Sequence, residues 1–144
     1  MDGNPSIIVP VAFDILRDAV DYYKINQGFT EDHLESLHDV FGNIFIGAAE
    51  LLEHHKITQY RTDDGIRKVY KVGNKKEQFT IYENINFCHC PVFRYQVLEL
   101  QNCVTCKHVL AMILGDALGK VSKETVTGSQ MVDFLDEQLN YIVE

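Results

Sequence analysis

The sequence predicts an α+β fold, with N-terminal helices, a three-stranded antiparallel meander and C-terminal helices. Three observations lead to this prediction. Apolar residues recur at helical spacing up to about residue 56, β-branched and aromatic runs separated by turn signals follow, and helical spacing returns beyond residue 108. The boundaries expected from these changes are 1–56, 57–118 and 119–144, which at a length of 144 residues would form one compact domain.

Helical periodicity in the first part of the chain predicts two or three helices. The first is expected to begin at Pro10, because the fixed φ of proline suits the first helical turn, and to end before Gly28. Thr30 is the expected N-cap of the second, which has acidic residues in its first turn and ends at Gly42. "NIFIGAAELLEHH" continues the pattern, and these apolar faces are expected to pack in the core.

Strands are expected next, over "ITQYRT", "GIRKVYKV" and "EQFTIYE". The turn signals Asp63–Gly65 and Gly73–Lys76 separate them and predict the antiparallel meander. Farther along the chain, "VLAMILGDALG" predicts an apolar helix that Gly119 ends. "SQMVDFLDEQLNYIV" then predicts a last, amphipathic helix.

The net charge of −8 is spread unevenly along the chain. It is −7 over residues 1–56, +3 over 57–108 and −4 over 109–144. A mostly acidic chain binds nucleic acid poorly by itself, because that affinity depends largely on neutralising phosphates, so we expect a protein partner. We expect no membrane span and an intracellular location, because the sequence has neither a long apolar run nor a basic leader.

All four cysteines and two of the six histidines lie in the segment 88–108, "CHCPVFRYQVLELQNCVTCKH". In an intracellular chain, clustered cysteines hold a metal more often than they form disulfides. Cys88 and Cys90 are two residues apart, so both thiols would face the same side of an extended strand. Cys106 and His108 can reach the same ion if Cys106 precedes a helix that starts near residue 107.

Three thiolates and one imidazole satisfy the tetrahedral coordination of Zn²⁺ and leave no open position. The sequence therefore predicts one structural zinc ion held by Cys88, Cys90, Cys106 and His108.

Two further donors, Cys103 and His89, are less favoured as ligands. Strand alternation points His89 to the opposite face, and Cys103 is expected to be a small buried or neighbouring thiol. A redox pair of Cys103 with Cys106 is a weaker alternative, because the thioredoxin-like βαβ pattern is absent.

The pattern C-x-C-x15-C-x-H, with Ala111 three residues after the histidine, resembles the SWIM type of zinc module. The small side chain of Ala111 would let its helix approach the strands closely. "LESLHDVFG", "AAELLEHHKIT" and "GIRKVYKV" extend the resemblance over residues 30–115, to the SWIM-domain subunit family of the Shu complex.

This resemblance implies a nuclear, non-enzymatic protein of homologous recombination repair. It implies binding to a RecA-like recombinase paralog and support of recombinase filaments on single-stranded DNA, which the chain would contact through the complex. The sequence agrees, because it has no G-x-S-x-G or H-E-x-x-H motif. "GDALGKVS" departs from a phosphate-binding loop at Val121, and we expect no small-molecule substrate.

The predicted hairpins carry an alternative, direct contact with single-stranded nucleic acid. Their cations interleave with Tyr60, Tyr70 and Phe79, which could stack on bases. The cations are Arg61, Arg67, Lys68, Lys71, Lys75 and Lys76. Solvated charge on exposed strands is the ordinary interpretation, and it remains open beside this one.

Overall fold

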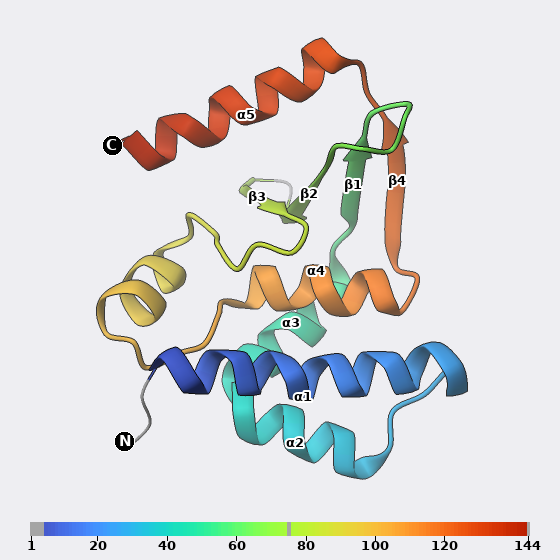
Figure 1. Cartoon of the computed structure of the whole chain (residues 1–144), viewed down its shortest axis with the longest axis vertical. Helices are drawn as coiled ribbons and strands as arrows, with labels where there is room; N and C mark the ends of the chain where they lie inside the picture. The colour runs from blue at the N-terminus through green and yellow to red at the C-terminus, as the bar shows by residue number, and fades with distance from the viewer. Residues whose placement is uncertain (1–4, 75, 144) are drawn as a thin grey trace.

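The computed structural model describes the backbone of residues 5–74 and 76–143, and the side chains of residues 9–74 and 76–137. Helices form both ends of the described chain; three strands follow the N-terminal helices, and a fourth lies between the last two helices (Figure 1). The helices are α1 Pro5–Asn26, α2 Glu31–Phe41, α3 Asn43–His54, α4 Lys107–Ala117 and α5 Gly128–Val143. The strands are β1 Ile57–Arg61, β2 Lys68–Gly73, β3 Gln78–Tyr82 and β4 Val121–Thr125. A short π-helical segment, η1, spans Phe93–Glu99.

The α+β class and the helical N-terminal region are confirmed, with one boundary corrected. Helix α1 begins at Pro5, and Pro10 lies inside it. Pro5 satisfies the same first-turn preference, so the earlier proline starts the helix. Thr30 caps α2 as expected: its Oγ1 accepts a hydrogen bond from the His33 backbone N–H at 3.1 Å. The Thr30 N–H in turn donates to Nδ1 of His33 at 3.3 Å, which completes a capping box.

The sheet has four strands in the order β3-β2-β1-β4. The first three form the predicted antiparallel meander, with Tyr60 opposite Val69 and Val69 opposite Tyr82. The expectation that residues 119–144 hold only a helix is wrong, because β4 pairs parallel with β1 from Ile57–Val121 to Arg61–Thr125. A parallel partner is reached by a crossover connection, which here includes α4, so no local turn signal marks it.

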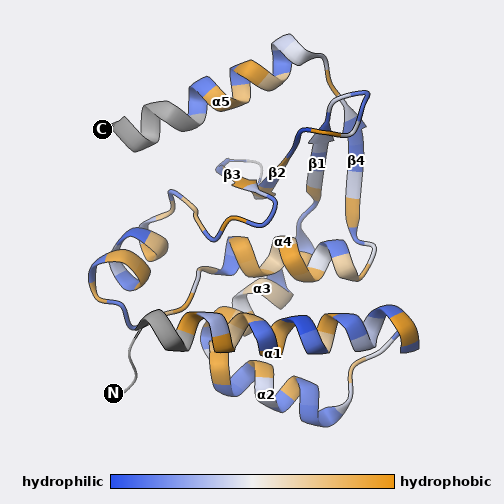
Figure 2. Cartoon of the chain, in the orientation of Figure 1, coloured by the Kyte–Doolittle hydropathy of each residue, from blue (hydrophilic) through white to orange (hydrophobic). Residues whose placement is uncertain are grey.

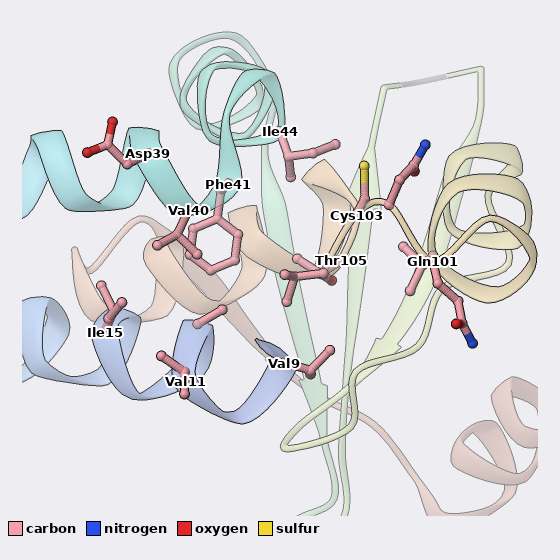
Figure 3. A pocket seen from close by; sticks show the side chains of 14 residues that line it. Val9, Val11, Ile15, Asp39, Val40, Phe41, Ile44, Gln101, Cys103 and Thr105 are labelled. Carbon is pink, nitrogen blue, oxygen red and sulfur yellow. The ribbon is translucent and has the colours of Figure 1, made fainter. Parts of the chain in front are cut away.

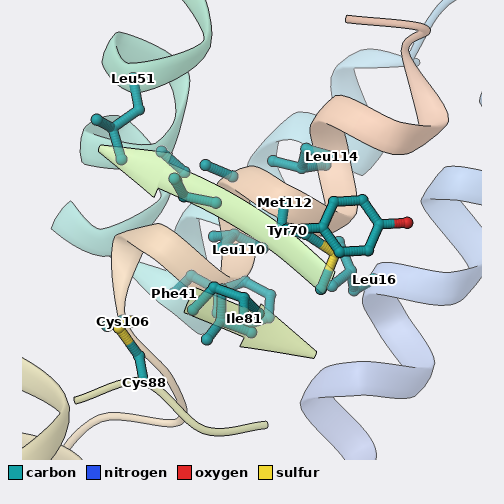
Figure 4. Close-up of a cluster of buried hydrophobic side chains, with 14 of the residues drawn as sticks. Leu16, Phe41, Leu51, Tyr70, Ile81, Cys88, Cys106, Leu110, Met112 and Leu114 are labelled. Atoms are coloured by element: carbon teal, nitrogen blue, oxygen red, sulfur yellow. The ribbon is translucent and has the colours of Figure 1, made fainter. Parts of the chain in front are cut away.

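Helices α4 and α5 lie on opposite sides of the strands (Figure 1). Helix α4, which is largely hydrophobic (Figure 2), packs between the sheet and helices α1 and α3. The main core forms around it, and Leu16, Tyr70, Ile81, Leu110 and Leu114 are among its buried members (Figure 4). Among the described residues, no helix combines the length and apolar character that crossing a membrane requires.

Helix α4 approaches its neighbours closely at Gly115. A Cβ atom at this position would lie 2.9 Å from Cδ2 of Leu52 and 3.2 Å from Cδ1 of Ile57. Ala111, one turn earlier, is fully buried, as a small residue at a close helix contact should be. The close approach fixes α4 against β1, and it therefore fixes the position of the α4 N-terminus.

Candidate metal centre

Four side chains from two separate segments meet at the N-terminus of α4. The three Sγ atoms of Cys88, Cys90 and Cys106 and a ring nitrogen of His108 all lie within 4.8 Å of one another. Each side chain is buried, and His108 is the most exposed at 7%. The structure thus brings together the four residues that the sequence predicts as ligands.

The local backbone agrees with the prediction at Cys106 and differs from it at Cys88 and Cys90. Cys106 has extended geometry, with φ −104° and ψ 169°, and the helix begins at the next residue. Cys88 and Cys90, however, follow the end of β3 and lie in irregular chain, not in a strand. Their thiols still converge, because the ligand atoms of all four residues lie within 4.8 Å of one another.

Hydrogen bonds from Asn86 join the two ligand-bearing segments. Its Nδ2 donates to the Val104 carbonyl oxygen at 3.0 Å, and its Oδ1 accepts from the Thr105 hydroxyl at 2.6 Å. Asn86 is two residues before Cys88, and Thr105 directly precedes Cys106. These bonds hold the ligand pairs in register. Sequence spacing gave no signal for them, because the partners are 18 and 19 residues apart.

Neighbouring groups orient two of the four side chains. The ring of His108 packs on Phe79, with ring centroids 4.3 Å apart, and its Nδ1 lies 3.8 Å from the Cys88 sulfur. The backbone N–H of Phe93 donates to the Cys90 sulfur at 3.4 Å. Such N–H groups stabilise a thiolate, because they place positive partial charge beside it.

The thiols of this cluster cannot all ionise without a cation, because like charges in a buried site repel. Hydrogen bonds from Cys106 and Cys88 lower the pKa of Cys90 and make it the favoured thiolate. The pKa of Cys88 is raised, by its hydrogen bonds with Cys106 and Cys90 and then by burial. A divalent cation would attract all three thiolates and remove this conflict, so the donor set fits a metal.

The chemistry of the donors favours zinc among the common metals. Thiolates and imidazoles are soft or borderline ligands, which suit Zn²⁺ and do not suit Mg²⁺ or Ca²⁺. A set of four such ligands completes a tetrahedral shell. A bound zinc ion would therefore link the segment after β3 to the start of α4 and would have no position open for substrate.

The two other donors of the segment lie away from this cluster. Cys103 lines a pocket of about 500 Å³ together with Val11, Phe41 and Ile44 (Figure 3), and burial raises the pKa of its thiol. The ring of His89 packs on Phe79, the ring that also contacts His108, at a centroid distance of 4.8 Å. Neither side chain is part of the group of four that the described residues form.

The basic residues of the hairpins have different surroundings. Arg67 and Lys76 are exposed, Arg61 is half-buried, and Lys68 pairs with Glu83 at 3.8 Å. Lys75 lies outside the described residues. Lys71 is only 9% exposed, because α5 covers it, so its ammonium is not available to nucleic acid in this arrangement.

The aromatic residues interleaved with these cations are also not exposed for base stacking. Tyr70 and Phe79 are buried on the α4 side of the sheet, where Tyr70 accepts a hydrogen bond from Gln59 at 2.8 Å. Tyr60 stacks against Phe134 of α5, with ring centroids 5.1 Å apart. The hairpins therefore offer positive charge at their surface, without the interleaved stacking rings that the sequence indicated.

Relatives of this chain share most of its length. It is 31% identical to zinc finger SWIM domain-containing protein 7 of Danio rerio, over 92% of this chain and 95% of the relative. The protein of that name from Mus musculus is 32% identical, over 92% of this chain and 87% of its own length. The one from Homo sapiens is 26% identical, over 90% of this chain and 94% of its own length.

No protein-family model and no solved structure matches the chain significantly. The likeness to the curated relatives nevertheless spans the N-terminal helices, the sheet and the cysteine-rich segment, because it covers about nine-tenths of the sequence. The chain therefore belongs to the family of zinc finger SWIM domain-containing protein 7.

Proposed function

We propose that this protein is a non-enzymatic, zinc-binding subunit of a Shu-type complex. In this role it binds a RecA-like recombinase paralog and promotes the assembly or stability of recombinase filaments on single-stranded DNA, in the nucleus, during homologous recombination repair. The observation that carries the proposal is the SWIM family membership over nearly the whole chain. The recombination role itself rests on the resemblance to the Shu subunit family.

The metal centre supports an adaptor more than a catalyst. One zinc ion, held by Cys88, Cys90, Cys106 and His108, would have four protein ligands and no water to activate. Its role would be to fix the chain between the ligand pairs, because metal binding of this kind is coupled to local folding.

The surface of the segment between the ligand pairs supports the proposal that the protein binds a protein partner. Its apolar side chains Tyr95, Leu98 and Leu100 are each more than half exposed, on or beside η1. Exposed apolar groups gathered on one segment are typical of protein interaction sites. Since both ends of this segment carry metal ligands, its presentation to a partner would depend on zinc.

Purification from native cells under mild conditions, followed by mass spectrometry, tests the proposal. We expect a RecA-like paralog to co-elute in stoichiometric amount. The Cys106→Ser variant should lose this partner, whereas Cys103→Ser, which makes the same change outside the cluster, should retain it. A preparation of the unaltered protein that contains no such paralog would contradict the proposed role.

A further inference from the structure

The sheet face opposite α4 is polar and carries aromatic rings. Strand alternation and the observed register place Thr58, Tyr60, Val69, Lys71, Thr80 and Tyr82 together on this face. By contrast, their sequence neighbours Tyr70, Val72 and Ile81 point into the main core. This face offers a covering helix both polar groups, from a lysine and two threonines, and apolar ones, from two tyrosine rings and Val69.

Helix α5 covers this face through an aromatic ring and a carboxylate. The ring of Phe134 lies 5.1 Å from the ring of Tyr60 and 5.0 Å from Nζ of Lys71, measured from its centroid. Oε1 of Glu137 is 3.4 Å from the same Nζ, which also donates to the Thr80 hydroxyl at 2.6 Å. The lysine ammonium is thus enclosed by a ring, a carboxylate and a hydroxyl.

A single-stranded nucleic acid offers the same two kinds of group. Its bases stack on aromatic side chains, and its phosphates pair with lysine. In this structure Phe134 lies where a base would stack on Tyr60, and Glu137 lies where a phosphate would meet Lys71. The sequence of α5 strengthens the likeness, because residues 128–144 contain four acidic residues and no lysine or arginine.

The apolar contact of α5 lies apart from the main core. Val69 and Met131 line one pocket beside Tyr82, and both are buried, but neither belongs to the main apolar cluster. The Tyr82 hydroxyl is buried and has no hydrogen-bond partner among the described residues. Glu137 remains half exposed, so water competes for its contact with Lys71. Displacing α5 would therefore cost less free energy than exposing the α4 side of the sheet, which belongs to the main apolar core.

We propose that the sheet face under α5 is a binding site for single-stranded nucleic acid, and that α5 is its displaceable cover. Bases stack on Tyr60 and Tyr82, and Lys71 holds a phosphate, once Phe134 and Glu137 have moved away. Glu124 of β4 lies on the same face opposite Tyr60, so the strand follows β1, β2 and β3 and avoids β4. The site goes beyond the proposed adaptor role and does not depend on a recombinase paralog.

The test uses the full-length protein and a fluorescent oligodeoxythymidine of about 15 nucleotides, which suits a surface of this kind. Binding is measured by anisotropy over a salt titration. The variant Phe134→Ala/Glu137→Gln removes both covering groups, and we expect it to bind about tenfold more tightly, because a larger fraction of molecules is open. The matched control Val132→Ala/Asp136→Asn changes one exposed apolar and one exposed acidic residue of the same helix and should not alter binding.

Adding Lys71→Ala or Tyr60→Ala to the open variant should remove the gain. Hydrogen exchange over residues 128–137 reports whether α5 has left the sheet. A second variant, Met131→Asp, places a charge at the buried anchor of α5 and should release the helix without disturbing the main core.

Three results would overturn the proposal. They are a released helix with no gain in binding, a gain that persists in the Lys71→Ala background, and a helix that neither variant releases. Failure of this site is distinguishable from failure of the adaptor role, because co-elution of a recombinase paralog is measured separately on the unaltered protein.

Discussion

The two faces of the sheet are built from alternate residues of the same strands, yet they are covered in different ways. On one face, Tyr70 and Ile81 pack against α4 in the main core. At the end of that face lies the metal cluster, where the ring of His108 packs on Phe79. On the other face, Lys71 and Thr80 meet an acidic helix through polar contacts.

The two covers of this small sheet therefore differ in how readily they can be removed. Apolar surface exposed to water carries a free-energy cost that grows with its area, so the α4 face must stay covered. Polar groups on the α5 face can exchange their partners for water or for a ligand at a much smaller net cost. Metal ligands at the edge of the apolar face strengthen the contrast, because zinc would hold that side closed.

The largest expected effect comes from removing a metal ligand. Cys106→Ser should abolish zinc binding and lower the free energy of unfolding by about 3–5 kcal/mol, because the remaining thiols are left buried without a cation. Metal analysis and urea unfolding measure both quantities. Cys103→Ser is the matched control and should keep the zinc, and equal zinc content in the two variants would contradict the assigned ligand set.

The next effect sharpens the contrast between the helices that cover the two faces. Leu110→Ala in α4 removes a fully buried side chain and should destabilise the protein by about 2–5 kcal/mol. Leu135→Ala in α5 changes a residue that is 37% exposed, and it should cost less than about 1 kcal/mol. Urea unfolding of both variants is the measurement. Similar losses for the two would show that α5 belongs to the cooperative core.

A smaller effect is expected where α4 approaches its neighbours. Gly115→Ala should destabilise the protein by about 1–3 kcal/mol, because the new Cβ would force the packed Leu52 and Ile57 side chains to move, at a cost larger than the gain in helix propensity. Gly47→Ala is the control within α3, where the new atom would meet only the flexible Lys107 side chain. It should be neutral or stabilising, since alanine favours the helix. Thermal unfolding compares the two, and stabilisation by both would refute the tight contact at Gly115.

The smallest effect is expected on the polar face. Lys71→Met should change the free energy of unfolding by no more than about 1 kcal/mol, because Glu137 is half exposed and water can replace the lysine as its partner. Chemical denaturation gives the value. A loss as large as that of Leu110→Ala would mean that the polar contacts of α5 are as important to stability as the apolar core.

Local patterns in the sequence predicted the parts of the fold that depend on local physics. Thr30 caps α2 because its side chain meets a backbone N–H three residues away. The metal cluster was predictable for a similar reason, since each ligand pair is two residues apart and its backbone geometry decides where it points. The segments of β1, β2 and β3 were marked by turns between them.

Features that depend on distant partners were not predictable in this way. Strand β4 is short and mostly exposed, and its pairing partner β1 lies about 60 residues earlier in the chain. Lys71 looks like a solvated strand lysine in the sequence, and its burial follows from Glu137 and Phe134, which are more than 60 residues away. Nothing in the sequence around Asn86 predicts its hydrogen bond with Thr105, because the two residues are 19 positions apart.

We expect a structural zinc ion to hold the α4 side of this protein together. Zinc content of the purified protein, with hydrogen exchange measured before and after chelation, tests it most directly. We predict one zinc ion per chain, and faster exchange over residues 86–110 when zinc is removed, with α5 little affected. Absence of zinc, or unchanged exchange over that segment after its removal, would contradict the claim.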